Sequence, residues 1–182
     1  FPPSVTPRSL PGVSLARSPL HALAGMDADR VRIEDAMRAA VVTSHPYLTE
    51  LASHLIRAGG KRLRPALAVA AGQVGGEPAS DDVVQGGVAC ELVHLGSLYH
   101  DDVMDEAETR RGVETVNARW GNLQAILAGD FLFSRASEIA ASLGTEVAGL
   151  LALFCCVNAV KRFTEGEPPP SGEIDAPVKG LE

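Results

Sequence analysis

The apolar residues of this chain recur at helical spacing, and this periodicity restricts the fold more than any other feature. Leu48, Leu51, Ala52, Leu55 and Ile56 follow an i, i+3, i+4, i+7, i+8 pattern, which places them on one face of a helix. No segment alternates long enough to predict a strand, and no internal repeat is visible. The fold is therefore predicted to be all-α, with helices over about 27–44, 48–58, 65–74, 80–105, 122–143 and 145–161.

Composition agrees with helices and limits the possible ligands. Aromatic residues make up only 4% of the 182 residues, and alanine and leucine dominate the apolar set. Both residues enter a helix at little entropic cost. The net charge of −7 argues against general binding to nucleic acid or to anionic membranes. An anionic substrate would therefore have to meet a local basic cluster.

The cysteines and the apolar segments point to a reduced compartment and to no membrane span. Cys90, Cys155 and Cys156 lack the spacing of a zinc site or a disulfide framework, so a cytoplasmic location is expected. The longest apolar stretch, 147–160, is shorter than the roughly 20 residues that a spanning helix needs. It predicts a buried core helix instead.

The two ends of the chain differ in composition from its centre. Residues 1–25 hold prolines, serines and two arginines but no acidic residue, which predicts a disordered leader, with a transit peptide as the alternative. The segment 161–182 is rich in proline, glycine and glutamate and is also expected to be disordered. The helical domain is thus predicted over 26–160, with a polar loop near 106–115.

Three aspartates lie at the end of the predicted helix 80–105. Asp101, Asp102 and Asp105 belong to the sequence HLGSLYHDDVMD at 94–105. Asp101 and Asp105 lie on one helical face, where like charges repel and oppose the helix dipole. A divalent cation would relieve this repulsion, and carboxylate oxygens suit Mg²⁺. The alternative is a solvated acidic helix end.

Two basic clusters accompany these acids. The sequence GGKRLRP at 59–65 places Lys61 and Arg64 three residues apart near a predicted helix N-terminus, and Arg110 and Arg111 follow the aspartates. Helix N-termini attract anions, and guanidinium groups match phosphate oxygens in pairs. Each cluster alone could be a basic surface turn. Together with the acids, they indicate a polyphosphate ligand bound with a metal ion.

These motifs resemble, in order and spacing, the trans-isoprenyl diphosphate synthases, or polyprenyl synthetases. The likeness rests on 59–65, 94–105 and the RRG sequence at 110–112, and it covers roughly 28–150. It implies a helical bundle of the isoprenoid synthase type, truncated to about its first six helices. It also implies Mg²⁺ bound by Asp101 and Asp105, with Asp102 beside them.

The resemblance further assigns substrates and a reaction. Isopentenyl diphosphate and an allylic prenyl diphosphate would condense to a longer trans-polyprenyl diphosphate. Arg110 would contact the allylic diphosphate, and Lys61, Arg64, His94 and Arg111 would contact isopentenyl diphosphate. The residues expected to be catalytic are Asp101, Asp105 and Arg110.

The chain also departs from this family. A second aspartate-rich motif is expected well after the first, and nothing after Asp130 supplies it. An isolated chain is therefore expected to be poorly stable or to expose a large apolar patch. The alternative function is a non-catalytic diphosphate-binding subunit or an inactive truncated remnant. A homodimer or a complementing subunit is the expected assembly.

Two further alternatives concern specificity. Class I terpene cyclases share the aspartate-rich motif, but 59–65 and the Arg110–Arg111 pair would serve a second diphosphate that such cyclases do not use. Small residues precede the aspartates at Gly96 and Ser97. They either open a pocket for a product longer than farnesyl diphosphate or let a neighbouring helix pack closely.

Overall fold

The chain forms an all-α fold, as predicted. The computed structural model describes residues 25–76 and 78–165, with side chains described as far as 157. Residues 1–24 of the leader expected over 1–25, and residues 166–182 of the tail expected over 161–182, lie outside this range. The helices are α1 (Met26–Ala40), α2 (Pro46–Arg57), α3 (Leu63–Gly72), the 3₁₀ turn η2 (Gln73–Gly75), α4 (Asp81–Met104), α5 (Val116–Trp120), α6 (Asn122–Ser142) and α7 (Thr145–Glu165).

The segment expected to be a polar loop contains a small β-hairpin. β1 (Thr109–Arg110) pairs antiparallel with β2 (Val113–Glu114). The two turn residues, Arg111 and Gly112, have φ of 53° and 78°, as a two-residue hairpin turn that follows the strand twist requires. Strands of two residues are too short to show an alternating pattern, which explains why sequence periodicity did not reveal them.

Other boundaries also differ from the prediction. The described residues contain seven α-helices, where about six were expected, and the additional one is the short α5. Thr115 caps α5 by accepting a hydrogen bond from the Ala118 backbone N–H. Helix α7 continues to Glu165, beyond the expected end near 161.

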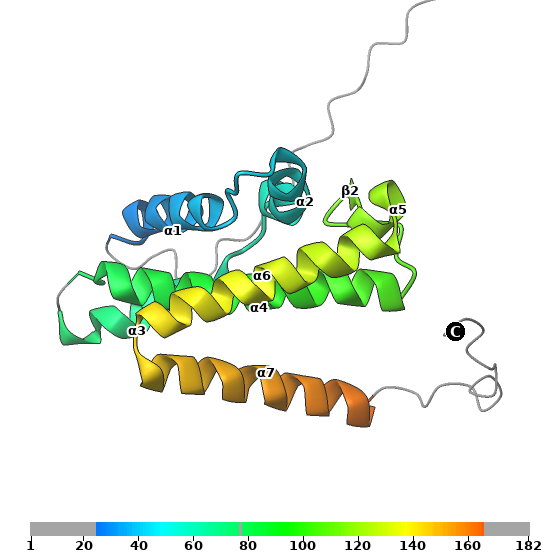
Figure 1. Cartoon of the computed structure of the whole chain (residues 1–182). Coiled ribbons are helices and arrows are strands. Elements are labelled where there is room, and N and C mark those ends of the chain that lie inside the picture. Colours follow the sequence, from blue (N-terminus) through cyan, green and yellow to red (C-terminus); the bar gives the residue numbers. More distant parts are fainter. Residues whose placement is uncertain (1–24, 77, 166–182) are drawn as a thin grey trace, which may run out of the picture.

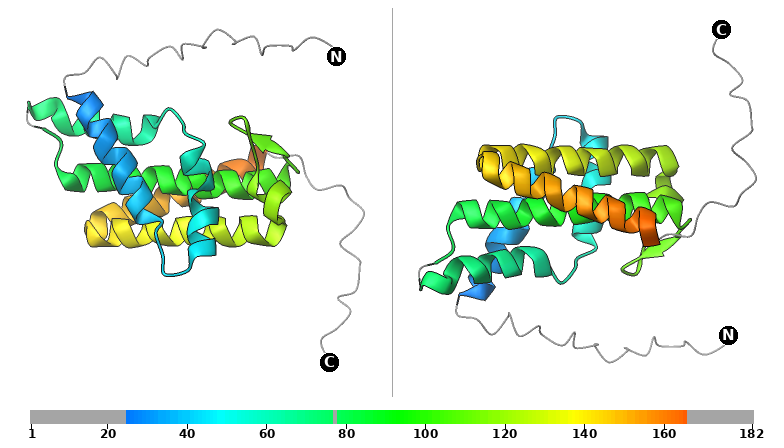
Figure 2. Two further views of the ribbon diagram at one scale, coloured as in Figure 1. Left: turned by 90° about the horizontal axis from the view of Figure 1, so that it is seen from above. Right: turned by 90° about the horizontal axis from the view of Figure 1, so that it is seen from below.

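Helices α4 and α6 form the centre of the bundle and share its most extensive helix contact. Figures 1 and 2 show that they run side by side in opposite directions. Helices α1 and α2 cross one side of this pair, α7 covers the other, and the hairpin with α5 lies at the end where α4 finishes. The acidic motif therefore sits at the hairpin end of the central layer.

Glycines allow α4 and α6 to approach closely. A Cβ atom at Gly96 would lie 3.0 Å from the carbonyl oxygen of Gly129, and one at Gly129 would lie 3.1 Å from that of Gly96. Close helix packing thus accounts for Gly96. The Ser97 hydroxyl donates to the His94 carbonyl oxygen at 2.8 Å, and a role for Ser97 in product length stays a prediction.

The core joins side chains from most helices of the bundle. Helix α4 begins after Ser80, whose side chain accepts a hydrogen bond from the Val83 backbone N–H. The buried apolar residues include Ile33, Met37, Leu51, Leu55, Val88, Leu92, Leu95 and Leu132. These side chains lie between the central pair and helices α1 and α2, which fixes the position of α4 and its acidic end.

Helix α7 is exposed on much of its apolar surface. Leu151 is 7% exposed, but Leu150, Leu153 and Val157 are 68%, 60% and 56% exposed. The prediction of a buried core helix over 147–160 is therefore wrong for the described side chains, because no described element covers the outer side of α7. These exposed side chains agree with the expected apolar patch. Among the described residues, every helix is too short or too polar to cross a membrane.

Tyr99 ties α4 to α2 and offers a test of the fold. Its buried hydroxyl donates to the Leu51 carbonyl oxygen at 2.6 Å and accepts from the Leu55 backbone N–H at 3.3 Å. We expect Tyr99→Phe to lower the free energy of unfolding by about 1–3 kcal/mol, because both backbone groups lose a partner. Urea unfolding followed by circular dichroism measures this change.

The matched control is Tyr47→Phe, since Tyr47 is 42% exposed. Its stability should stay within about 0.5 kcal/mol of the parent. Equal stabilities for both variants would contradict the role of the Tyr99 hydroxyl.

Candidate anion and metal site

The turn between α2 and α3 is held in place by a buried arginine that sequence reasoning missed. Arg62 adopts φ 48°, and its side chain is only 2% exposed. Its guanidinium donates to Glu34 Oε1 on α1 at 2.7 Å and to the Ile56 carbonyl oxygen on α2 at 2.9 Å. The sequence KRLR gives no signal that separates this arginine from its neighbours, because burial depends on the surrounding helices.

The hairpin brings the second basic cluster against this turn. Arg111 Nη1 donates to the Gly59 carbonyl oxygen and, at 3.4 Å, to that of Leu55. A Cβ atom at Gly60 would lie 2.8 Å from Arg111 Nη1 and 3.1 Å from Arg62 Nη1. Two basic segments about fifty residues apart in the sequence therefore meet at Gly60.

A single buried carboxylate lies between two of these cations. Glu91 on α4 has a 3%-exposed side chain, with Oε1 3.7 Å from Arg62 Nη1 and Oε2 3.8 Å from Arg64 Nη1. The Arg64 side chain is 41% exposed, so it combines a buried counter-ion with access to solvent. Such an arginine can contact an external anion.

His94 lies one turn after Glu91, and its pKa responds to most of the residues predicted for the site. Its partial burial, followed by the positive charges of Arg64, Arg111 and Arg110, lowers its pKa to about 4, while Asp101 acts in the opposite direction. His94 is therefore neutral at pH 7 and can donate a hydrogen bond without adding charge. The structure brings these five predicted residues into one electrostatic environment.

The pKa of Arg111 indicates the same excess of positive charge. Burial and the charges of Arg62, Arg110 and Arg64 lower the pKa of Arg111, while Glu91 acts against them. Guanidinium groups that repel one another in this way gain from a bound anion. Lys61 is exposed in the same turn, and its role in binding stays a prediction.

The three aspartates do not form one set of ligands. Asp102 is buried and accepts a hydrogen bond from Arg110 Nε at 2.5 Å. Burial raises the pKa of Asp102, with added repulsion from Asp101 and Asp105, while the bond to Arg110 lowers it. No group of three His, Cys, Asp or Glu side chains within the described ranges is arranged to hold a metal ion.

Asp101 and Asp105 keep the positions that the sequence predicted. Asp105 is exposed and caps the C-terminal end of α4, and Asp101 is partly buried one turn earlier. Their shared face is compatible with a metal ion that completes its coordination with water and phosphate oxygens. Their role as ligands stays a prediction.

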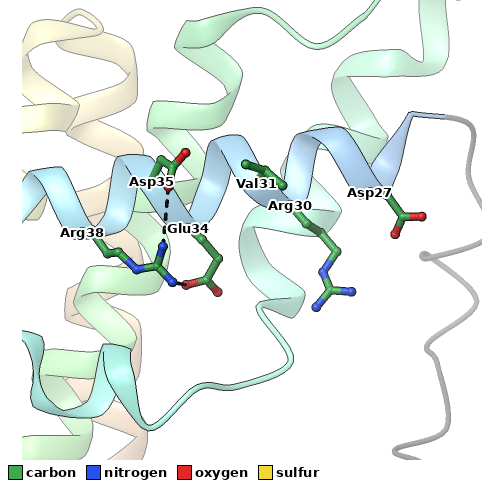
Figure 3. Close-up of a pocket in the computed structure, with 6 residues that line it drawn as sticks. All are labelled: Asp27, Arg30, Val31, Glu34, Asp35 and Arg38. Carbon is green, nitrogen blue, oxygen red and sulfur yellow. Dashed lines mark ion pairs between the residues drawn. The ribbon is translucent and has the colours of Figure 1, made fainter.

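A shallow hollow elsewhere on the surface is a poor candidate for the site. It lies along the exposed side of α1 and is lined by Asp27, Arg30, Val31, Glu34, Asp35 and Arg38, as Figure 3 shows. Arg38 pairs with Asp35 and Glu34 at 3.5 and 3.8 Å. Because these charges compensate one another, the hollow lacks the excess positive charge found around His94.

The low pKa of His94 predicts a pH-dependent stability. The folded-state pKa of about 4 lies below the value of 6.5 for an exposed histidine, as in the unfolded chain. The unfolded chain therefore binds this proton more tightly. His94 therefore lowers the free energy of unfolding progressively as the pH falls from about 6.5 to about 4. His94→Gln should show a shallower loss of stability over this range in urea unfolding. An NMR titration that gives His94 a pKa near 6.5 would contradict the clustering of cations.

Gly60 offers a test of how the two basic segments meet. Gly59→Ala and Gly60→Ala both introduce a side chain at positive φ, 84° and 154°, and share a strain of about 1–3 kcal/mol. Only Gly60→Ala places a methyl group against both guanidinium groups, since nothing lies within 4 Å of a Cβ at Gly59. We expect Gly60→Ala alone to displace Arg111 and raise the pKa of His94, measured by NMR. An unchanged pKa would contradict this arrangement.

Comparisons with known proteins all point to one family. Residues 45–167 match polyprenyl synthetase. The chain is 40% identical over 147 residues to nonaprenyl diphosphate synthase of Mycobacterium tuberculosis, covering 75% of this chain and 44% of that protein. It is 41% identical over 116 residues to heptaprenyl diphosphate synthase component 2 of Geobacillus stearothermophilus, covering 64% and 36%.

A solved structure shows the same fold. The polyprenyl synthase of Caulobacter crescentus, complexed with calcium and isoprenyl diphosphate, superimposes with a TM-score of 0.73 and 35% identity. The match covers 79% of this chain and 43% of that one, so the chain spans less than half the length of each of these three relatives. With its motifs, helices and matched residues in agreement, the chain belongs to the polyprenyl synthetase family.

Proposed function

We propose that this chain supplies the diphosphate-binding part of a prenyltransferase. The reaction would condense isopentenyl diphosphate with an allylic diphosphate to give a longer trans-polyprenyl diphosphate. The observation that carries this proposal is the gathering of Arg64, Arg111 and Arg110 around His94, whose pKa is lowered to about 4 by burial and then by these positive charges. A diphosphate is a ligand that would relieve this repulsion.

Asp101 and Asp105 are proposed to hold Mg²⁺ together with the allylic diphosphate. Mg²⁺ commonly uses one or two protein carboxylates and completes its shell with water and phosphate oxygens, so these two side chains fit its chemistry. The Caulobacter relative, with calcium and isoprenyl diphosphate bound, supports a divalent cation. When bound, Mg²⁺ would neutralise charge that develops on the leaving diphosphate. Asp102 would act by orienting Arg110, to which it is already bonded.

The remaining residues would hold and separate the two substrates. Arg110 would stabilise the departing allylic diphosphate as its carbon–oxygen bond breaks. Lys61, Arg64 and Arg111 would bind isopentenyl diphosphate, with neutral His94 as a hydrogen-bond donor. The isopentenyl double bond would then attack the allylic cation, forming a carbon–carbon bond and releasing a proton. Apolar helix faces would exclude water from the cation.

Activity is proposed for an assembly rather than for the isolated chain. The chain spans 44% of the Mycobacterium relative, and the Geobacillus relative is named as one component of its enzyme. A homodimer or a complementing subunit could use the exposed apolar residues of α6 or α7; those of α6 are Leu123, Ile126 and Leu127. A cytoplasmic assembly remains our proposal.

The alternative function is binding without catalysis, as expected of a regulatory subunit or an inactive remnant. It predicts the same binding of diphosphate and metal ion but no new carbon–carbon bond.

One experiment separates the two functions. The purified chain is incubated with labelled isopentenyl diphosphate and farnesyl diphosphate, with and without Mg²⁺, and products are separated by chromatography. Calorimetry with inorganic pyrophosphate measures binding in parallel. A longer labelled product supports prenyl transfer, and Mg²⁺-dependent binding without product supports the alternative. Absence of pyrophosphate binding would contradict both.

The control variants test the metal assignment. Asp101→Asn combined with Asp105→Asn should remove the Mg²⁺ dependence of pyrophosphate binding, because the cation loses its protein ligands. Asp35→Asn on the exposed side of α1 should leave binding unchanged. Equal Mg²⁺ dependence in both variants would exclude Asp101 and Asp105 as the metal ligands.

A further inference from the structure

Glu91 is a buried acid, and one of its oxygens has no hydrogen-bond partner among the residues that the structure describes. The residue is 2% exposed, and its Oε2 atom is buried without a donor within hydrogen-bond distance. A buried carboxylate without adequate pairing is costly. Because Glu91 lies on the central helix between Arg62 and Arg64, its charge bears directly on the cation cluster.

The two arginines beside Glu91 differ in how they are held. Arg62 has three further partners, Glu34 and the carbonyl oxygens of Ile56 and Gly59, and its side chain is almost fully buried. Arg64 is 41% exposed, and its described ion pair is with Glu91 at 3.8 Å. Loss of Glu91 would therefore leave Arg62 anchored but would remove the attraction that keeps Arg64 near the site.

We propose that Glu91 is a positioning residue of the anion site, whose buried carboxylate holds the Arg64 guanidinium beside His94 while leaving it able to contact a ligand. The separation of 3.8 Å exceeds a hydrogen bond, so Arg64 is oriented without being fully engaged. This inference deepens the proposed function, since the anion is taken to be a diphosphate. The placement of Arg64 itself does not depend on that assignment.

The pKa of His94 reports the position of Arg64. The charged groups that act on His94 are Arg64 from α3, Arg110 and Arg111 from the hairpin, and Asp101 from α4, and Arg64 is the strongest of these charges. Removal of the negative charge of Glu91 would by itself lower the His94 pKa. Movement of Arg64 away from His94 would raise it. The direction of change therefore separates positioning from a direct charge effect.

The first experiment is an NMR titration of His94 in the full chain without ligand. We expect Glu91→Gln to raise the pKa of His94 by about half a unit or more, because Arg64 is released. Glu91→Asp keeps the charge but shortens the side chain, so it should also raise the pKa, and it serves if Glu91→Gln fails to fold. The matched control is Glu138→Gln, which removes a carboxylate from Arg135 on α6 and should leave the His94 pKa unchanged, because neither residue is among the charges that act on His94.

A second variant series tests whether the effect passes through Arg64. Arg64→Met should raise the His94 pKa by itself, and Glu91→Gln should cause no further rise in that background. A fall or no change of the His94 pKa in both Glu91 variants would overturn the proposal. The proposal would also be overturned if Glu91→Gln raised the His94 pKa equally in the parent chain and in the Arg64→Met background.

Binding of inorganic pyrophosphate, measured by calorimetry at fixed Mg²⁺, connects Glu91 to the site. Glu91→Gln should weaken binding by about three- to tenfold, because the ligand must now order Arg64 itself. The control variant Glu138→Gln should change binding less than about twofold. Unchanged or tighter binding in Glu91→Gln would overturn the positioning role. If the parent chain binds no pyrophosphate, the proposed function fails, while the titration still decides the placement of Arg64.

Discussion

The buried guanidinium of Arg62 connects four helices. Arg62 is the N-cap residue of α3. Its guanidinium bonds to Glu34 on α1 and to the Ile56 carbonyl oxygen on α2, and it lies 3.7 Å from Glu91 on α4. A charge removed from water must be paired and hydrogen-bonded. The helices must therefore pack so that their acceptor groups all reach the Arg62 guanidinium. The conformation of the turn at 59–62 depends on this interaction, and so does the position of the basic residues on and beside the turn.

This arrangement also shapes the electrostatics of the site. Arg62 lies beside Arg111 at Gly60, and Arg64 and Arg110 add positive charge around His94. The folded chain thus holds like charges together before any ligand arrives. Such preorganisation is how proteins stabilise charge that develops during a reaction. It is the physical basis of the proposed anion site in a chain whose net charge is −7.

The apolar residues of the bundle are tightly packed in its interior but exposed on one outer side. Interior positions of α4 and α6 are tightly packed through Gly96 and Gly129, whereas the outer side of α7 exposes large aliphatic side chains. Large exposed apolar patches commonly mark contact surfaces. The relatives are more than twice as long as the matched segment.

The sequence by itself determined the helical fold, the acidic motif on α4 and the residues of both basic clusters. These features follow from local rules, because periodicity of 3.6 residues and helix propensity act within a few turns. The tertiary structure decided that Arg62 is buried, that Asp102 turns to Arg110, and that Glu91 lies between two arginines. Partners of charged side chains are chosen by distance in space and by exclusion of water, and residues far apart in the chain set both.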